Sequence, residues 1–176
     1  MGSEMCIRDR KIATDIINSF EKKYEEKWLN MMRDKLGLFG TNEKDKLLIL
    51  DLLTWMHQNK VDYTNTFCHL MNLTIEHNNN YESDDFLNWK KRWKERLKTN
   101  NNSPEKFINL MRSVNPLVIP RNHKVEEALI EANEDSMDSL SKILEAVSEP
   151  YSIQKDIIDY QIPSSLNDKY QTFCGT

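Results

Sequence analysis

The sequence predicts an all-α fold, an irregular multi-helix array of about seven helices. Successive segments repeat apolar residues at the three- or four-residue spacing of an amphipathic helix, and none shows the alternation of a half-buried strand. Asn runs and isolated Pro residues separate these segments. With 176 residues, of which 39% are hydrophobic and 30% charged, the chain has the composition of one globular domain.

The first predicted helix spans about residues 11–36 and ends at Gly37, which suits the left-handed residue that often follows a helix. Its apolar stripe consists of Ile12, Ile16, Phe20, Tyr24, Trp28 and Met32. Residues 1–10 show no helical or strand period and resemble a translated adaptor sequence, so we expect them to be non-native. The helical domain is then expected at 11–162, with a tail at 163–176.

A second helix is expected from Thr41 or Asn42 to about Asn59. Apolar side chains cover most of the circumference of its middle turns. Because a helix that is apolar all round is normally buried, we expect it to be the central helix of the fold. Truncation of Leu50 should then cost about 2–5 kcal/mol of stability.

The next three helices carry recognisable start signals. Asp62 and Ser83 are suited to cap the third and fourth helices, because their side-chain oxygens can accept a backbone N–H of the first turn. Ser103 followed by Pro104 marks a fifth helix, since proline lacks only an N–H that a helix start leaves unused. The apolar face of the fourth helix consists of Phe86, Trp89, Trp93 and Leu97.

Two prolines then interrupt the helical pattern. Pro116 and Pro120 favour extended conformations at the residues before them, so residues 114–121 should form a fixed, strand-like crossing. A sixth helix should begin at Arg121 or Asn122.

The last helical signals follow the sixth helix. A seventh helix should be capped near Ser136 and stopped by Pro150. Its apolar residues are Leu140, Ile143, Leu144 and Val147. One short helix is expected around residues 153–160, before the irregular tail.

Charge and hydropathy exclude some classes of partner. The net charge of −4 and the pI near 5.6 do not favour nucleic acid as a partner. The longest apolar stretch, residues 47–56, is far shorter than the ~20 residues that span a bilayer, so no membrane partner is expected. The start of the chain lacks the features of a secretory signal, which favours a cytoplasmic location, or a mitochondrial one if the source is eukaryotic.

The segment 88–98 is strongly basic and interleaves lysine and arginine with Trp89 and Trp93. Such a helix could bind phosphate or an anionic lipid surface, and the chain would then be a stand-alone helical binding module. The alternative is that the two tryptophans, one helical turn apart, pack inward while the lysines face water.

No metal or nucleotide site is indicated. The four histidines and three cysteines lack the paired spacing typical of structural zinc. Acidic pairs stand at or near predicted helix starts, where they suit the helix dipole, and four glycines leave no Gly-rich phosphate loop. We therefore assign no catalytic, cofactor-binding or metal-binding residue to this chain.

Arg121, Asn122 and His123 form a candidate site for an anion or for contact with another domain. They follow the two prolines and stand at the predicted start of a helix, where the dipole favours negative charge. The alternative is structural: Asn122 caps the helix, while Arg121 pairs with Glu126 or with a carboxylate from another part of the protein.

Cys174 is the residue to which the sequence assigns chemistry. It lies two positions from the chain's end, between Phe173 and Gly175, so its thiol should be accessible. Without a basic neighbour, its reactivity would have to come from whatever it docks against, and the alternative is an inert terminal cysteine. Cys68 is expected to be a packed thiol.

Several segments resemble the selenoprotein O family. Residues 115–129 (NPLVIPRNHKVEEAL) are similar to the family's NPxxIPRNHxVEEA segment, and FCGT at 173–176 is similar to its terminus, which has cysteine or selenocysteine at the position of Cys174. Further matches lie in the same order at 32–38, 61–67, 89–93 and 150–151. Cys68 departs from the family pattern, which usually has arginine there.

The resemblance implies a kinase-like (pseudokinase) fold and the transfer of AMP from ATP to Ser, Thr or Tyr hydroxyls of proteins, with Mg²⁺. It covers only the family's C-terminal portion, so the nucleotide and metal residues would lie in an upstream kinase-like domain. That domain and the protein substrates are the expected partners. The resemblance further implies a redox role for Cys174 with a partner cysteine outside this chain, and inactivity of the chain alone.

Overall fold

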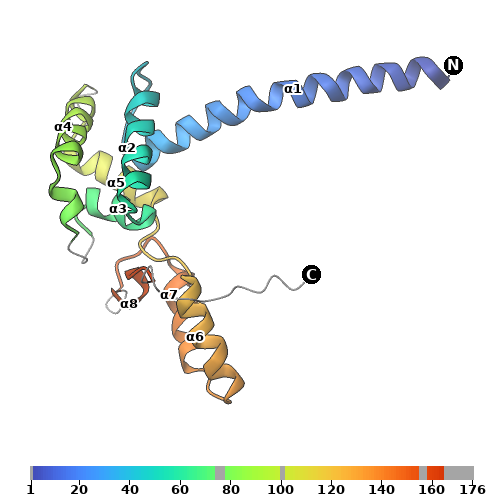
Figure 1. Cartoon of the computed structure of the whole chain (residues 1–176). Helices are drawn as coiled ribbons and strands as arrows, with labels where there is room; N and C mark the ends of the chain where they lie inside the picture. The colour runs from blue at the N-terminus through green and yellow to red at the C-terminus, as the bar shows by residue number, and fades with distance from the viewer. Residues whose placement is uncertain (1, 74–77, 100–101, 155–157, 165–176) are drawn as a thin grey trace.

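The computed structural model describes residues 2–73, 78–99, 102–154 and 158–164 (Figure 1). These residues form α1 (Gly2–Lys35), α2 (Asp45–Asn59), α3 (Tyr63–Leu70), the 3-10 helix η1 (Asn79–Glu82), α4 (Asp84–Lys98), α5 (Pro104–Val114), α6 (Asn122–Asn133), α7 (Asp138–Ser148) and α8 (Ile158–Gln161). No strand occurs within the described ranges, so the all-α prediction is confirmed.

Helix α1 is longer than predicted. Its helical backbone begins at Gly2 and runs through the segment for which the sequence shows no helical period. It ends as expected before Gly37, whose φ of +69° is the left-handed conformation that glycine adopts without strain.

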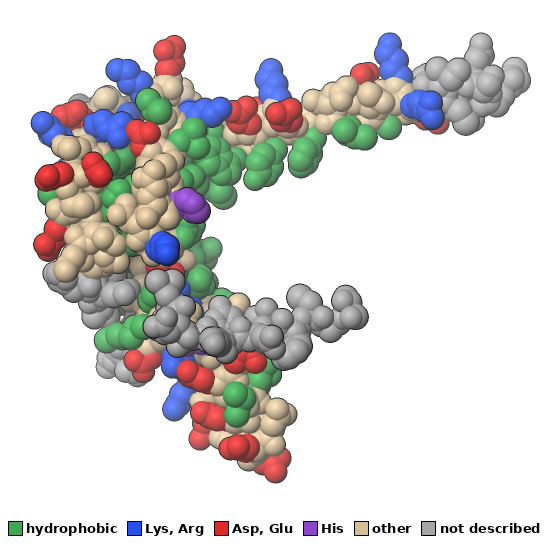
Figure 2. Space-filling model, in the orientation of Figure 1, with side chains coloured by type: hydrophobic (Ala, Val, Ile, Leu, Met, Phe, Trp, Pro, Cys, Tyr) green, Lys and Arg blue, Asp and Glu red, His purple; other side chains and the backbone are tan. Residues whose placement is uncertain are grey.

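The apolar stripe of α1 packs only at its C-terminal end. Met32 is buried and Trp28 is partly buried against the core. The first half of the helix projects away from the other helices (Figure 1), and there Ile12 is 52% and Phe20 67% exposed. Figure 2 shows hydrophobic side chains gathered along one side of this projecting part. The part of the stripe from Ile12 to Tyr24 is therefore a helix face that no described residue covers.

Helix α2 is buried on one side only, which corrects the expectation of an all-round buried helix. It begins at Asp45, three or four residues later than predicted, and packs against α4 and α1. Ile49 and Leu52 are fully buried on that side, whereas Leu50 is 41% exposed. The expectation that truncating Leu50 would strongly destabilise the protein is therefore wrong. Because apolar residues surround the whole helix, the sequence does not show which side packs against a neighbour.

The predicted caps of α3 and α4 are confirmed. The Asp62 carboxylate accepts the backbone N–H of Asn65 at 2.8 Å, and the Ser83 hydroxyl accepts that of Phe86 at 3.4 Å. The start of α5 at Pro104 is also as predicted, although Ser103 makes no side-chain capping bond. These helices meet α1 and α2 in one core, whose largest fully buried side chains include Phe67, Phe86, Met111 and Val118.

The segment after α5 leaves the helical conformation, as the two prolines predict, and its backbone is extended at Asn115 and Arg121. It is not a straight strand-like crossing, because Val114 still belongs to α5 and the chain bends at Asn115 and Leu117. Leu117 and Val118 are buried in it, and the N–H of Leu117 donates to the carbonyl of Pro150 at 2.6 Å. The buried Asn115 amide donates to the carbonyl oxygen of Lys35 at 2.9 Å, which ties the crossing to the end of α1. The crossing thus links the core to the C-terminal helices.

Helices α6 and α7 form an antiparallel pair that projects from the core (Figure 1). Their starts differ from the expected caps. Arg121 precedes α6 without a side-chain cap bond, and Met137, rather than Ser136, precedes α7. On α7, Ile143 is buried but Leu144 is 58% exposed. Helix α8 is a single short turn. It follows residues 155–157, which are not among the residues that the structure describes.

Candidate functional site

Trp89 and Trp93 hold α4 against the core. Both side chains are buried, and their indole Nε1 groups donate to the carbonyl oxygens of Leu48 at 2.8 Å and Leu36 at 2.9 Å. A buried indole with a satisfied N–H is typical of a packing role. The inward-packing interpretation of the basic segment is therefore confirmed for its tryptophans.

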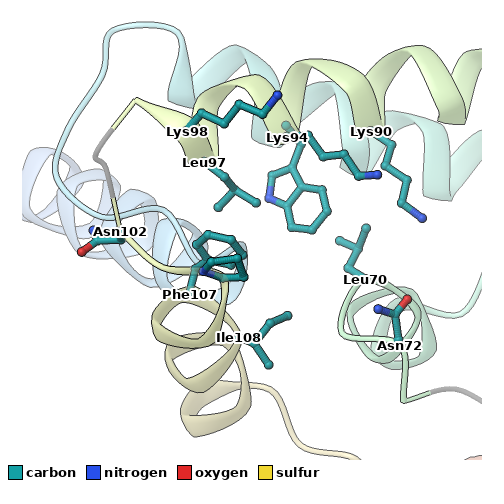
Figure 3. Close-up of a pocket in the computed structure, with 11 residues that line it drawn as sticks. Leu70, Asn72, Lys90, Lys94, Leu97, Lys98, Asn102, Phe107 and Ile108 are labelled. Atoms are coloured by element: carbon teal, nitrogen blue, oxygen red, sulfur yellow. The ribbon is translucent and has the colours of Figure 1, made fainter.

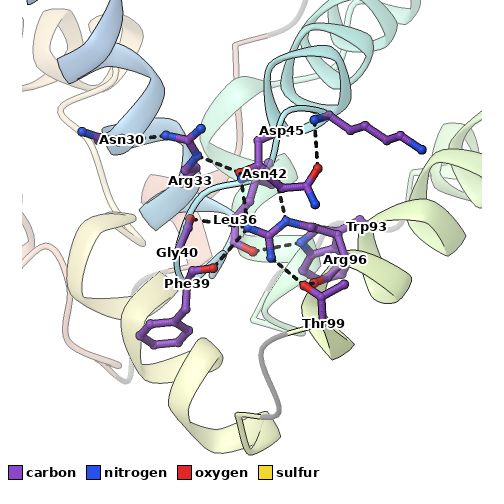
Figure 4. Close-up of polar contacts among 11 residues, drawn as sticks. Asn30, Arg33, Leu36, Phe39, Gly40, Asn42, Asp45, Trp93, Arg96 and Thr99 are labelled. Carbon is purple, nitrogen blue, oxygen red and sulfur yellow. Dashed lines mark hydrogen bonds and ion pairs between the residues drawn. The ribbon is translucent and has the colours of Figure 1, made fainter.

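Arg96 fixes the C-terminal end of α4 to the start of α2 (Figure 4). Its Nε donates to Asp45 Oδ1 at 2.7 Å and its Nη2 to Asp45 Oδ2 at 3.2 Å. The same guanidinium donates to the Phe39 carbonyl at 3.1 Å and to the Thr99 hydroxyl at 2.9 Å. Arg33 of α1 completes the cluster with a 2.7 Å bond to Asp45 Oδ2.

Asp45 is fully buried, yet it remains ionised. Burial alone would raise its pKa, but the hydrogen bonds from Arg96 and Arg33, the N–H of Asn42 and the charge of Arg96 outweigh burial, so the pKa lies below its usual value. The carboxylate therefore acts as the anionic centre that joins α1, α2 and α4. No sequence pattern pointed to it, because its partners lie 12 and 51 residues away.

A groove lies beside α4, between α3 and α5 (Figure 3). Its volume is about 610 Å³, which is within the usual range for ligand pockets. One edge carries Lys90, Lys94 and Lys98, and the apolar lining consists of Leu70, Trp93, Leu97, Pro104, Phe107 and Ile108. We call this the lysine groove. The sequence indicated basic character here, but not that three of the lysines border an apolar hollow.

The three lysines of the groove are charged neighbours on one face of α4. They are spaced one turn apart, and no carboxylate in the described ranges forms an ion pair with them. Burial, and then the charge of Lys94, lowers the pKa of Lys90. Like charges one turn apart repel, so an anion bound in the groove would relieve an unfavourable interaction.

Arg121 clamps the C-terminal helices to α3. Its Nη1 and Nη2 donate to the two Asp62 carboxylate oxygens at 2.8 and 3.1 Å, and its Nε donates to the Tyr160 carbonyl at 3.1 Å. Its Nη2 also donates to Asn65 Oδ1 at 3.3 Å. The structural alternative is thus confirmed for Arg121, with a carboxylate from another part of the chain rather than Glu126.

Asn122 and His123 follow Arg121 as the first two residues of α6. Asn122 is exposed as the first residue of α6 and makes no capping bond, and His123 is half-buried on the same helix. The Arg121 guanidinium is already hydrogen-bonded to Asp62. The interpretation of this trio as an anion or interdomain contact stays a prediction.

Cys68 is unsuited to thiol chemistry. Cys68 is fully buried, with its Sγ 3.8 Å from the Pro116 carbonyl oxygen. Burial, and then the nearby charge of Asp62, raises the pKa of the Cys68 thiol to about 11. The expectation of a packed thiol is confirmed. Cys174, the predicted redox residue, lies outside the described residues.

Within the described ranges, no group of three or more His, Cys, Asp or Glu side chains gathers in a metal-binding arrangement. His69 instead stacks on Tyr81, with ring centroids 3.9 Å apart. Burial, and then the charge of Lys90, lowers the pKa of His69 to about 4, so its imidazole is neutral. None of the described helices is both long and apolar enough to cross a membrane.

Known proteins are similar in sequence to this chain over almost its whole length. Residues 4–148 match the family model for "Protein adenylyltransferase SelO". The "Protein nucleotidyltransferase YdiU" of Pelagibacter ubique is 48% identical over 167 residues, and those of Alcanivorax borkumensis and Bacillus cereus strain G9842 are each 45% identical, over 166 and 168 residues.

These alignments cover 93–94% of this chain but only 34–35% of the relatives. The chain therefore spans about a third of the length of the curated relatives that it matches. The family match begins at residue 4, inside the segment 1–10 that was expected to be non-native. The match over most of the chain shows that it belongs to the protein adenylyltransferase SelO family.

Proposed function

We propose that this chain is the C-terminal helical part of a SelO-type protein nucleotidyltransferase. The whole enzyme would transfer AMP from ATP, with Mg²⁺, to Ser, Thr or Tyr hydroxyls of protein substrates. The family match and the printed names of the relatives support this activity, and the one-third coverage supports a separate catalytic part. The bacterial relatives and the need for ATP favour the cytoplasm as its location.

The uncovered face of α1 carries the proposal, because it supplies the surface that a catalytic part would cover. Ile16, Phe20 and Tyr24 repeat every four residues and are 60–67% exposed. A row of large apolar side chains along several helical turns is unfavourable in water and is typical of a surface that packs against protein. We infer that the upstream kinase-like domain packs against this face, while the C-terminal end of α1 is held in the core by α2 and α5.

A transfer assay on the chain alone tests the first half of the proposal. The chain is incubated with ATP labelled in the α-phosphate, Mg²⁺ and a mixture of carrier proteins. We expect no transfer of label to the chain or to the carriers, because the nucleotide residues would lie upstream. Label on either one would show that the chain contains an active site.

A chimera tests the second half. The matching segment of the Pelagibacter ubique relative is replaced with this chain, which is 48% identical to it, and AMP transfer is measured. Phe20→Asp in the chimera should lower transfer by at least about tenfold, because a carboxylate would be forced into an apolar contact. Lys22→Asp, two residues away and also exposed, is the matched control. Equal activity of the two variants would contradict docking through the stripe.

A further inference from the structure

The lysine groove combines a row of positive charges with an apolar hollow. Figure 3 shows Lys90, Lys94 and Lys98 along α4. Phe107 and Ile108, which belong to α5, lie on the opposite wall of the groove. No described carboxylate pairs with the lysines, although the chain as a whole is acidic. A ligand that fits this groove must carry several negative charges and apolar groups together.

The spacing of the lysines matches that of side chains on an extended peptide. A helix rises ~1.5 Å per residue, so residues four apart are displaced by ~6 Å along the axis, and Lys90 lies ~12 Å from Lys98. In an extended chain, side chains on the same side lie about 6.6 Å apart, because each residue advances ~3.3 Å. Alternate residues of an extended peptide can therefore face successive lysines.

The other lining residues suit the remaining parts of such a peptide. Side chains on its second face would point toward Phe107 and Ile108 of α5, where apolar groups gain by burial. Asn72 and Asn102 also line the groove, and their amides can donate to and accept from peptide groups. An acyl chain would use the apolar lining but not the amides, and one lipid phosphate would neutralise only part of the lysine row.

We propose that the lysine groove binds an extended segment of another protein in which acidic residues alternate with apolar ones. The acidic side chains pair with Lys90, Lys94 and Lys98, and the apolar side chains enter the hollow between α4 and α5. This site goes beyond the proposed AMP transfer and does not rest on it, because binding by the chain alone requires no nucleotide.

The test uses fluorescence anisotropy with the whole chain and a fluorescein-labelled hexapeptide that alternates aspartate with leucine. We expect saturable binding that weakens with salt, and no binding of the peptide that alternates asparagine with leucine. The double variant Lys94→Gln, Lys98→Gln should bind about tenfold more weakly, since exposed ion pairs contribute up to ~1 kcal/mol each. Both lysines are exposed, so the fold should survive.

Lys91→Gln is the matched control, because Lys91 is an exposed lysine of the same helix that does not line the groove. It should change the affinity less than about twofold. A charge-reversed variant, Lys94→Glu with Lys98→Glu, should instead bind a peptide that alternates lysine with leucine. Absence of binding by the acidic peptide, or equal weakening by Lys91→Gln, would overturn the proposal. Lysine-dependent binding of vesicles containing anionic phospholipid, without peptide binding, would overturn it in favour of a lipid surface.

Discussion

Arg96 binds both carboxylate oxygens of Asp45, with its Nε 2.7 Å from Oδ1 and its Nη2 3.2 Å from Oδ2. The two residues are 51 positions apart, and both are buried. A bidentate pair of this kind fixes the relative orientation of the two side chains as well as their distance. It therefore sets the position of α4, and with it the lysine groove, relative to α2.

Asp45→Asn should destabilise the chain by roughly 3 kcal/mol, because it leaves the buried Arg96 guanidinium without its counter-charge. The control is Asp51→Asn, which removes the exposed pair between Asp51 and Arg92 of the same two helices. It should cost less than about 1 kcal/mol. Urea unfolding followed by circular dichroism measures both values, and equal effects would contradict a special role for Asp45.

The same comparison gives a pH dependence. The folded-state pKa of Asp45 is depressed, so the unfolded state binds the proton more readily. Its contribution to stability is present above the unfolded pKa, near ~3.9, and is lost as pH falls through the lower folded value. Wild type should lose its advantage over Asp45→Asn below about pH 4.

Gly37→Ala should destabilise the end of α1 by roughly 2–4 kcal/mol, through left-handed strain and overpacking together. An added Cβ would lie 2.9 Å from the Phe107 carbonyl oxygen, which is a backbone atom that cannot move aside easily. Thermal unfolding measures the loss. Asparagine tolerates the left-handed conformation but keeps a Cβ, so a Gly37→Asn variant as stable as wild type would show that the Phe107 contact is harmless.

Arg121→Lys should loosen the C-terminal helices without unfolding the core. Lysine cannot reproduce the bidentate hydrogen bonds to Asp62 together with the hydrogen bond to the Tyr160 carbonyl. Hydrogen exchange should accelerate in α6 and α8 and stay unchanged in α2. Arg92→Lys, in an exposed pair, is the matched control and should leave all regions unchanged. Uniform acceleration across the chain would contradict a local clamp.

His69 should make the protein less stable as pH falls from about 6.5 to about 4. In this window the unfolded histidine binds a proton, while the buried folded one resists it, so stability rises with pH. His69→Phe keeps the stacking on Tyr81 and should remove this part of the slope, of order 2 kcal/mol. Unfolding curves across this pH range test it, with the exposed His57→Gln as control. An unchanged slope in His69→Phe would refute the assignment.

Alkylation should distinguish Cys68 from Cys174. At pH 8 the raised pKa of Cys68 gives a thiolate fraction roughly 100-fold below that of an ordinary cysteine, and burial hinders access further. Peptide mapping after a short iodoacetamide pulse should find label at Cys174 and little at Cys68. Cys174→Ser should remove the fast label. Slow, equal labelling of the two would contradict a reactive terminal thiol.

The sequence alone predicted the features that depend on near neighbours. The caps by Asp62 and Ser83 involve residues three positions away, and the glycine after α1 reflects backbone preference. The two prolines likewise predicted the end of the helical pattern after α5. The inward packing of Trp89 and Trp93 followed from their helical spacing. The Cys174 site stays a prediction from sequence.

The tertiary structure decided which of the apolar faces are covered and which charges meet. Leu50 and Ile49 look equally buried in the sequence, but only Ile49 faces a neighbouring helix. Asp45 pairs with Arg96, 51 residues away in the sequence, and Arg121 pairs with Asp62, 59 residues away. Periodicity defines the side of a helix, whereas burial and ion pairing depend on what the rest of the chain places against that side. The lysine groove exists for the same reason: α4 supplies its charges, but only the packing of α3 and α5 beside it makes the hollow.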